Sequence, residues 1–403
     1  MAKGRTGFFC LCALFLVLGE ITSGTAADWA VLADIETKGE YNSNLNASPR
    51  SRLKDYILSA TPNVSFSYNT ELTQLKGMVG ITGMHYITYS HLDKINQRYL
   101  IDARHQAWER IRLNLGASFI SDSTLTEELI ASGTMLNRSL RNSYSFNPGF
   151  TYSITERLSS SLGYNFNMVE YEDPQYRDFR RHGVFLNFDY LWDEKTTLKE
   201  VLIGNFTEYD TNDTISSLGV QVGFNRKFSE NWDATLLGGA NYTKMKSSTG
   251  VLSFDDESGF ITFKQATRRS SSFSPFFTLS TTGRWQTGDL TLSYSRSESA
   301  SAYGNLSQYN NFDVFINQRF TEKLTGTLRP YFHTSTLDDP GSNYNSQYIG
   351  IRPGLKYNIT ERLILNTSYG FAYRSVSGNS DYNLPVHSIW LSLNYTYPIH
   401  AQY

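Results

Sequence analysis

The sequence predicts an all-β protein: a transmembrane antiparallel up-and-down β-barrel of about 18 strands, preceded by a cleaved signal peptide. Three observations predict this fold. Long segments alternate apolar and polar residues with a period of two, short and long connections follow one another in turn, and the chain begins with an export signal. The net charge of −2 gives no reason to expect nucleic acid as a partner.

Residues 1–27 are predicted to be the signal peptide and residues 28–403 the outer-membrane β-barrel domain. Lys3 begins a basic stretch, Phe8–Leu18 is apolar, and Ala27 ends a run of small residues that suits cleavage before residue 28. The apolar stretch is too short to span a bilayer as a helix. Both cysteines of the chain lie within this segment, so the mature chain is expected to contain no disulfide.

The clearest strand pattern is a hairpin that runs from Leu140 to Tyr171. In its first half the even positions are mostly apolar or aromatic, as at Tyr144 and Phe146, whereas the odd positions are small or polar. A period of two over about a dozen residues indicates a strand with one apolar and one polar face. The short polar turn at 155–157 leads into a second strand of the same kind, so the two are expected to pair antiparallel.

The same alternation predicts the other strands in order along the chain. They are expected at Val31–Tyr41, Tyr56–Tyr68, Leu72–Tyr89, Arg98–Gln106, Ile111–Phe119, His182–Trp192, Leu198–Tyr209, Leu218–Phe228, Trp232–Tyr242, Phe273–Trp285, Leu290–Arg296, Phe312–Phe320, Leu324–Phe332, Ile349–Ile359, Leu363–Tyr373 and His387–Tyr397. The Leu72–Tyr89 pattern is weaker because glycine and methionine interrupt it. Lys246–Ser271 is predicted to be the longest connection, with a small hairpin of its own near Val251 and Phe263.

The alternation of connection lengths indicates a membrane barrel. Very short turns, three of which read Ile154-Thr-Glu-Arg-Leu158 or nearly so, alternate with longer connections rich in serine, asparagine and glycine. This is the polarity of an outer-membrane barrel. Strands of about 11 to 14 residues suit a tilted crossing of the bilayer, and aromatic residues such as Tyr144 and Tyr152 lie near both ends of the apolar rows. Because every backbone amide in lipid needs a partner, the sheet is expected to close.

These segments also resemble a known family. Ile35–Tyr41 followed by Asn42 and Asn44, then Ser59–Phe66 with Pro62, then the repeated Thr-Glu-Arg-Leu turns, are similar to the outer-membrane β-barrel porins associated with exopolysaccharide and exosortase loci. The resemblance covers the mature chain and implies an outer-membrane conduit of a Gram-negative bacterium that exports a secreted polysaccharide. It implies polysaccharide as cargo. Because the chain lacks a periplasmic helical-repeat domain, it also implies a periplasmic polysaccharide-export protein as a partner.

The phase of each strand predicts which residues face the interior. The charged residues expected to line it are Arg98, Asp102, Arg104, Arg112, Arg181, Asp189, Arg284, Asp313, Arg319, Arg329, Arg352 and Arg374. Basic residues outnumber acidic ones in this set, so the interior is expected to attract anions, including acidic sugars. The alternative interpretation is that the arginines pair with carboxylates on neighbouring strands and hold the wall together.

Several aromatic residues share the inward phase. As candidates for stacking on sugar rings we identify Phe185, Phe276, Phe315, Tyr331, Tyr348 and Trp390. Alternatively, these rings pack against a connection that folds into the barrel, with Lys246–Ser271 as the expected segment.

No residue pattern predicts catalysis, a cofactor or a metal site. His333 lies close in sequence to Ser335 and Asp338, but a barrel hydrolase needs its serine, histidine and acid aligned on one wall, and no such alignment is present. Outer-membrane lipid and lipopolysaccharide are the expected partners. Besides polysaccharide export, two alternatives remain: a general diffusion porin for small solutes, and a loop-plugged structural or adhesive barrel.

Overall fold

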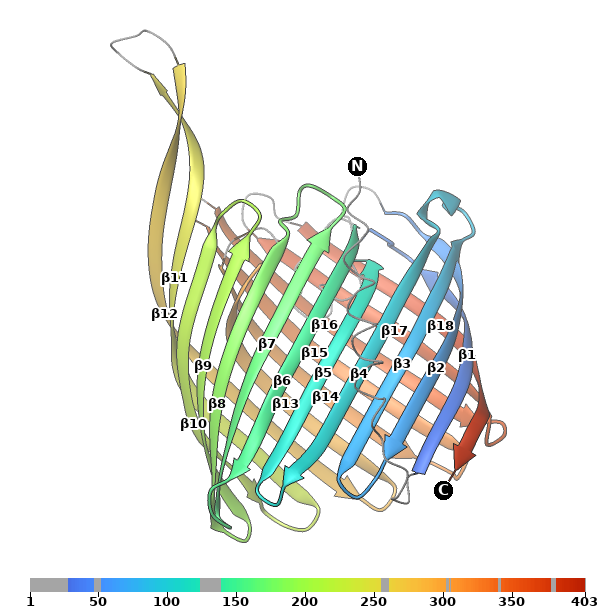
Figure 1. Cartoon of the computed structure of the whole chain (residues 1–403). Helices are drawn as coiled ribbons and strands as arrows, with labels where there is room; N and C mark the ends of the chain where they lie inside the picture. The colour runs from blue at the N-terminus through green and yellow to red at the C-terminus, as the bar shows by residue number, and fades with distance from the viewer. Residues whose placement is uncertain are drawn as a thin grey trace.

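Each strand of the chain pairs with its neighbours in sequence order (Figure 1). A computed structural model describes residues 28–46, 52–123, 139–254, 261–301, 304, 306–339, 342–377 and 382–402. Its 18 strands form one antiparallel sheet, which closes into a barrel because β1 pairs with β18. The predicted fold class and strand number are confirmed. The predicted signal peptide lies outside the described residues.

Most strands are longer than predicted, and their lengths run from 13 residues in β5 to 25 in β12; β3 is shorter than the predicted Leu72–Tyr89. Their bounds are β1 (Asp28–Asn42), β2 (Asp55–Asn69), β3 (Thr73–Tyr86), β4 (Lys94–Trp108), β5 (Ile111–Ser123), β6 (Leu140–Ser153), β7 (Leu158–Tyr171), β8 (Phe179–Asp193), β9 (Thr196–Tyr209), β10 (Thr214–Lys227), β11 (Trp232–Phe254), β12 (Ile261–Trp285), β13 (Gly288–Ala300), β14 (Leu306–Arg319), β15 (Leu324–Asp339), β16 (Ser342–Asn358), β17 (Leu363–Ser377) and β18 (Tyr382–Gln402). A short 3-10 helix, η2 (Ser90–Leu92), lies between β3 and β4. Within the described ranges, no helix is long and apolar enough to cross a membrane.

The two faces of the sheet differ as the period of two predicts. Outward side chains are largely apolar and exposed, as at Leu218, which is 69% exposed. The most deeply buried polar side chains, such as Ser335 at 1% exposure, belong to the opposite face, which lines the interior. A closed hydrogen-bonded wall with apolar side chains outermost suits contact with hydrocarbon, because its backbone amides are paired within the sheet.

Threonine side chains explain the repeated short turns. In the turn after β6, the Thr155 hydroxyl accepts hydrogen bonds from the backbone N–H groups of Arg157 (3.2 Å) and Leu158 (3.0 Å). Thr321 and Thr360 accept the corresponding bonds after β14 and β16. A hydroxyl that satisfies turn amides in this way favours a tight reversal. The Thr-Glu-Arg-Leu repeat is therefore a turn signature.

The segment predicted as the longest connection is largely a hairpin of two continuous strands. β11 and β12 stay paired as far as Phe254 and Ile261, and Leu252 lies opposite Phe263. Figure 1 shows this hairpin rising well beyond the rim that the other strands form. The expectation that Lys246–Ser271 folds into the interior is therefore wrong. The ladder of hydrogen bonds between β11 and β12 continues without a break, which keeps the hairpin extended.

Ser301, directly after β13, lies in the interior instead. The Tyr209 hydroxyl, at the end of β9, donates a hydrogen bond to the carbonyl oxygen of Ser301 at 2.7 Å. Three strands separate β9 from β13 in the wall, so this bond spans part of the interior. Leu306 joins Tyr209 in a buried apolar cluster. The inward turn has room to form because β12 pairs with β13 only from Phe277 to Trp285.

Candidate functional site

The interior face of the barrel carries every charged residue that strand phase predicts there. Arg98 lies opposite Gly80, Arg104 opposite Asn114, and Arg352 opposite Arg329 in the strand register. The same register places the others on this face: Asp102 (β4), Arg112 (β5), Arg181 and Asp189 (β8), Arg284 (β12), Asp313 and Arg319 (β14) and Arg374 (β17). That they line a conducting pore stays a prediction.

Some of these charges pair across neighbouring strands. The ion pairs are Arg284–Asp233 at 2.7 Å, Arg329–Asp313 at 2.8 Å and Lys199–Asp189 at 2.8 Å. Each joins two strands that are adjacent in the sheet, so these side chains brace the wall. Exposed pairs of this kind stabilise a protein by about 1 kcal/mol or less.

Other arginines have no such partner. Arg98 and Arg104 on β4, Arg112 on β5 and Arg352 on β16 form neither an ion pair nor a hydrogen bond with the described part of the chain. The first three are exposed on the interior face, as is Lys76 on β3. Unpaired guanidinium groups on a concave surface produce a positive potential and present donors that match carboxylate or phosphate oxygens.

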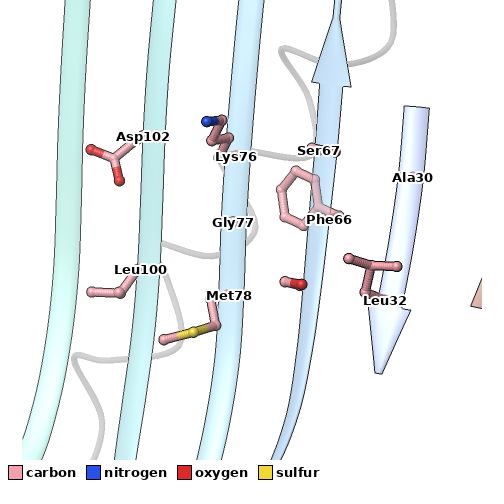
Figure 2. A pocket seen from close by; sticks show the side chains of 10 residues that line it. Ala30, Leu32, Phe66, Ser67, Lys76, Gly77, Met78, Leu100 and Asp102 are labelled. Carbon is pink, nitrogen blue, oxygen red and sulfur yellow. The ribbon is translucent and has the colours of Figure 1, made fainter. Parts of the chain in front are cut away.

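A hollow on β1–β4 has Lys76 in its lining (Figure 2). Leu32, Met78 and Leu100 contribute its apolar lining, and Lys76 and Asp102, which are opposite each other in the register of β3 and β4, lie next to them. The hollow has a volume of about 290 Å³. It combines apolar contact area with a cation and an anion, so it suits a small amphiphilic solute better than a fully polar one. Sequence reasoning missed Lys76 because its strand pattern is interrupted by glycines.

Three of the six predicted aromatic residues lie over glycines one or two strands away. A Cβ added at Gly163 would overlap the Phe185 ring, and one added at Gly350 would overlap Tyr331. Phe276 on β12 reaches across β11 to Gly219 on β10, where a ring carbon lies 3.1 Å from the Cβ position. Aromatic rings over glycines fill gaps in the pleated wall. Wall packing, and not an infolded Lys246–Ser271 segment, accounts for the position of these rings.

The other predicted aromatics do not form a continuous track. The hydroxyl groups of Tyr331 and Tyr348 are 3.4 Å apart, and Tyr348 is buried. The Lys38 ammonium lies 5.4 Å from the ring centre of Trp390. Phe315 on β14 is 40% exposed on the interior face and lies four strands away from Trp390 on β18. Stacking on sugar rings stays a prediction for these residues.

His333 has a different acidic neighbour from the one its sequence suggests. Its Nε2 lies 3.3 Å from a carboxylate oxygen of Asp313 on the adjacent strand β14. Ser335 lies two residues further along β15, but its hydroxyl is buried and has no hydrogen-bond partner. A nucleophile that substrate cannot reach does not make a hydrolase. Among the described residues no catalytic arrangement and no cluster of metal ligands is present.

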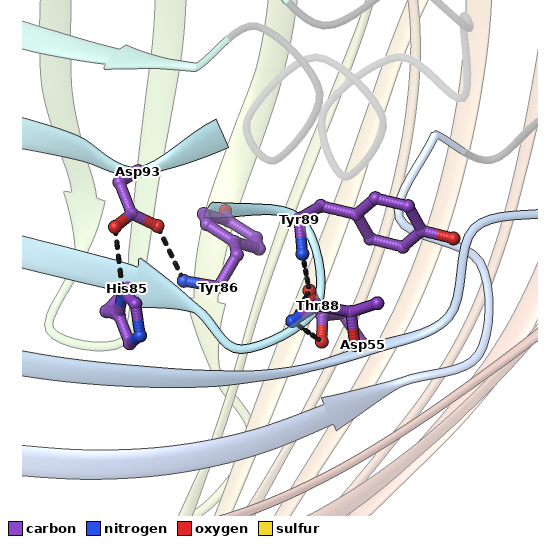
Figure 3. A network of polar contacts seen from close by, with 6 residues as sticks. All are labelled: Asp55, His85, Tyr86, Thr88, Tyr89 and Asp93. Carbon is purple, nitrogen blue, oxygen red and sulfur yellow. Dashed lines mark hydrogen bonds and ion pairs between the residues drawn. The ribbon is translucent and has the colours of Figure 1, made fainter. Parts of the chain in front are cut away.

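Two carboxylates anchor the connection after β3 (Figure 3). Asp55 accepts hydrogen bonds from the backbone N–H groups of Thr88 (2.9 Å) and Tyr89 (3.0 Å). Asp93 accepts one from the N–H of Tyr86 at 2.8 Å and lies 2.7 Å from Nδ1 of His85. The hydrogen bond from Tyr86, followed by that from His85, holds the pKa of Asp93 below its ordinary value.

This anchored connection covers inward residues at the end of the barrel with the longer connections. Ile57 and Tyr86 face the interior and are buried together with Leu45. The interior is therefore narrowed in two places: by this anchored connection, and by Ser301 on another part of the wall. Neither contact follows from the period-two pattern, because both join segments that are distant in sequence or lie in irregular connections.

Comparisons with known proteins give structural similarity only. No protein-family model and no curated protein matches the chain. The outer membrane protein OpdK of Pseudomonas aeruginosa is 12% identical, with a TM-score of 0.48 over 91% of this chain and 99% of that one. OccAB1 of Acinetobacter baumannii is 10% identical, with a TM-score of 0.47 over 93% and 97%. OccK2 of Pseudomonas aeruginosa, solved in complex with glucuronate, is 11% identical, with a TM-score of 0.45 over 92% and 98%.

The architecture itself shows which class of barrel the chain forms. A closed antiparallel barrel with an even number of strands, short turns at one end, longer connections at the other and an apolar outer face is typical of Gram-negative outer membranes. The chain is an outer-membrane β-barrel, as the sequence predicts.

Proposed function

We propose that this barrel is a diffusion channel for small water-soluble solutes, with a preference for anions. The observation that carries the proposal is the set of arginines without partners on the interior face: Arg98, Arg104, Arg112 and Arg352. Desolvating a charged solute is costly, and a wall of fixed positive charges offsets that cost for anions alone.

The size of the barrel supports passage of small solutes. Barrels of 16 to 18 strands leave an aqueous channel in porins. The interior is narrowed by the β13–β14 connection at Ser301 and by the connection held by Asp55. A partly narrowed bore with basic walls suits solutes of the size of sugar acids or small carboxylates.

Ion currents through planar bilayers test the proposal. The purified mature chain is expected to give stepwise conductance, and its reversal potential in a salt gradient is expected to have the sign of anion preference. The triple change Arg98→Ser, Arg104→Ser and Arg112→Ser should move that potential toward cation preference. Arg226→Ser removes one charge from the outer face and should leave it unchanged. Absence of current would indicate a barrel plugged by its own connections, with a structural or adhesive role.

Export of a secreted polysaccharide is the narrower function that the sequence resemblance implies, and we keep it as a second candidate on that ground alone. It requires a periplasmic partner that delivers the polymer. Deletion of the gene should abolish surface polysaccharide while its precursors are still made. Intact surface polysaccharide, together with slower uptake of small anions, would leave solute diffusion as the function.

A further inference from the structure

An apolar row on the outer face lies near the upper edge of the lipid-facing surface on β8–β12. The strand register aligns five outward positions across these strands: Val184, Gly204, Leu218, Tyr242 and Phe273. Leu218 and Phe273 are among the most exposed large apolar side chains, and Phe273 is 74% exposed. Exposed aliphatic and aromatic side chains at this level are expected to contact the outer part of the bilayer.

Basic residues follow directly beyond this row. Four positions further along each strand, toward the longer connections, the register aligns Arg180, Glu208, Thr214, Lys246 and Arg269. Lys244 lies between the two rows, with its ammonium 5.5 Å from the ring centre of Tyr242. We call Arg180, Lys244, Lys246 and Arg269 the basic patch. All four are exposed, and none forms an ion pair in the part of the chain that the structure describes.

The basic patch is confined to one side of the barrel. Further round the wall, the corresponding outward row across β14–β17 consists of Gln308, Thr336, Asn345 and Ser377, all uncharged. Only one acidic residue, Glu208, lies in the basic row. The patch also occupies the base of the β11–β12 hairpin, which rises above the rim (Figure 1). The hairpin thus extends the barrel wall upward on the side where the positive charge is concentrated.

We propose that the basic patch binds phosphate groups on the glycolipid of the outer leaflet. At about 3.3 Å per residue, four residues along a tilted strand raise the patch by about 10 Å above the apolar row. A headgroup region is about 5–8 Å deep on each side of the hydrocarbon core, so the patch lies at the level of its outer boundary. Lysine and arginine there face the lipid laterally, where the phosphates of a lipid A headgroup lie beside them. Arginine pairs with phosphate in a bidentate manner, and lysine adds point charge.

The test uses the purified mature chain in neutral detergent. Binding of bisphosphorylated lipid A and of dephosphorylated lipid A is titrated and measured by native mass spectrometry. The variant is Lys244→Gln, Lys246→Gln, Arg269→Gln. Each basic side chain beside an anionic membrane surface strengthens association by about fivefold, so losing three predicts weakening on the order of 100-fold at low salt and less at physiological salt.

A matched control removes three cations from the short turns at the other end of the barrel: Arg157→Gln, Lys323→Gln, Arg362→Gln. It should bind the phosphorylated lipid as the parent chain does. Equal binding of the two lipids, equal loss in both triple variants, or full displacement by millimolar inorganic phosphate would each overturn the proposal. The last result would mean a site for free phosphate. Bilayer conductance of the test variant is expected to be unchanged, so this outcome is separate from the channel proposal.

Discussion

Replacing Asp55 should release the connection between β3 and β4 without opening the barrel. The Asp55 carboxylate is 2% exposed and accepts hydrogen bonds from the N–H groups of Thr88 and Tyr89 (Figure 3). Its low exposure leaves little room for water to replace a lost bond. Hydrogen bonds to a charged group contribute about 1.5–3 kcal/mol each. Asp55→Ala should therefore destabilise the local closed state by about 3 kcal/mol or more, with both amides left without an acceptor.

Hydrogen exchange measures this directly, because local opening governs the protection of these amides. In the detergent-solubilised barrel, exchange at Thr88 and Tyr89 should be accelerated on the order of 100-fold. Amides within β2 and β3 should keep their protection because their ladder bonds remain. Asp55→Asn, which retains a neutral acceptor, should show a smaller effect. Unchanged protection in Asp55→Ala would refute the idea that this carboxylate anchors the connection.

Three further predictions concern packing, the inward turn and pH. Gly223→Ala should lower the free energy of unfolding by about 1–3 kcal/mol, because backbone atoms of β11 occupy the place of a Cβ. Gly238→Ala should leave it unchanged, because no atom lies near its Cβ position. Thermal unfolding measures both variants, and equal effects would contradict this explanation. Tyr209→Phe should cost about 1 kcal/mol and make the β13–β14 connection more sensitive to protease; equal resistance would show that its hydroxyl does not hold Ser301. The pKa of Asp93 is lowered in the folded chain, so the contacts of its carboxylate stabilise the fold at a pH above the ordinary aspartate pKa. This stabilisation is lost as the pH falls through the folded pKa, below about 4. Hydrogen exchange at the Tyr86 amide, corrected for its intrinsic rate, should accelerate in that range.

Strand phase predicted most of the fold and the interior. In a closed barrel each residue faces either lipid or the interior, so alternation in the sequence fixes the side of every residue once a strand is identified. That is why Arg98, Asp313 and Trp390 lie on the face that their phase indicates. The short turns are also predictable from the sequence, because the Thr155 hydroxyl accepts hydrogen bonds from amides only two and three residues away.

Contacts between distant segments could not be predicted in this way. Polar composition suggests that Lys246–Ser271 is a connection, but paired backbones continue as strands to Phe254 and from Ile261, beyond the rim of the barrel. The inward turn depends on Tyr209 meeting Ser301, which lie 92 residues apart in the sequence. Similarly, alternation places Arg329 and Asp313 on the interior face, but only the register of β14 and β15 makes them partners. Such contacts depend on strand order and on the paths of irregular connections, which alternation does not encode.

Single cysteines on one strand test the central claim most directly, because residues 28–403 contain none. Val220 and Gln221 are neighbours on β10 that face the outer surface and the interior respectively. In reconstituted membranes, a charged membrane-impermeant thiol reagent should react with Gln221→Cys and reduce the ion current, and should not react with Val220→Cys. Reaction at Val220→Cys with no reaction at Gln221→Cys would contradict the account, because it would place water outside the barrel and apolar contact within it.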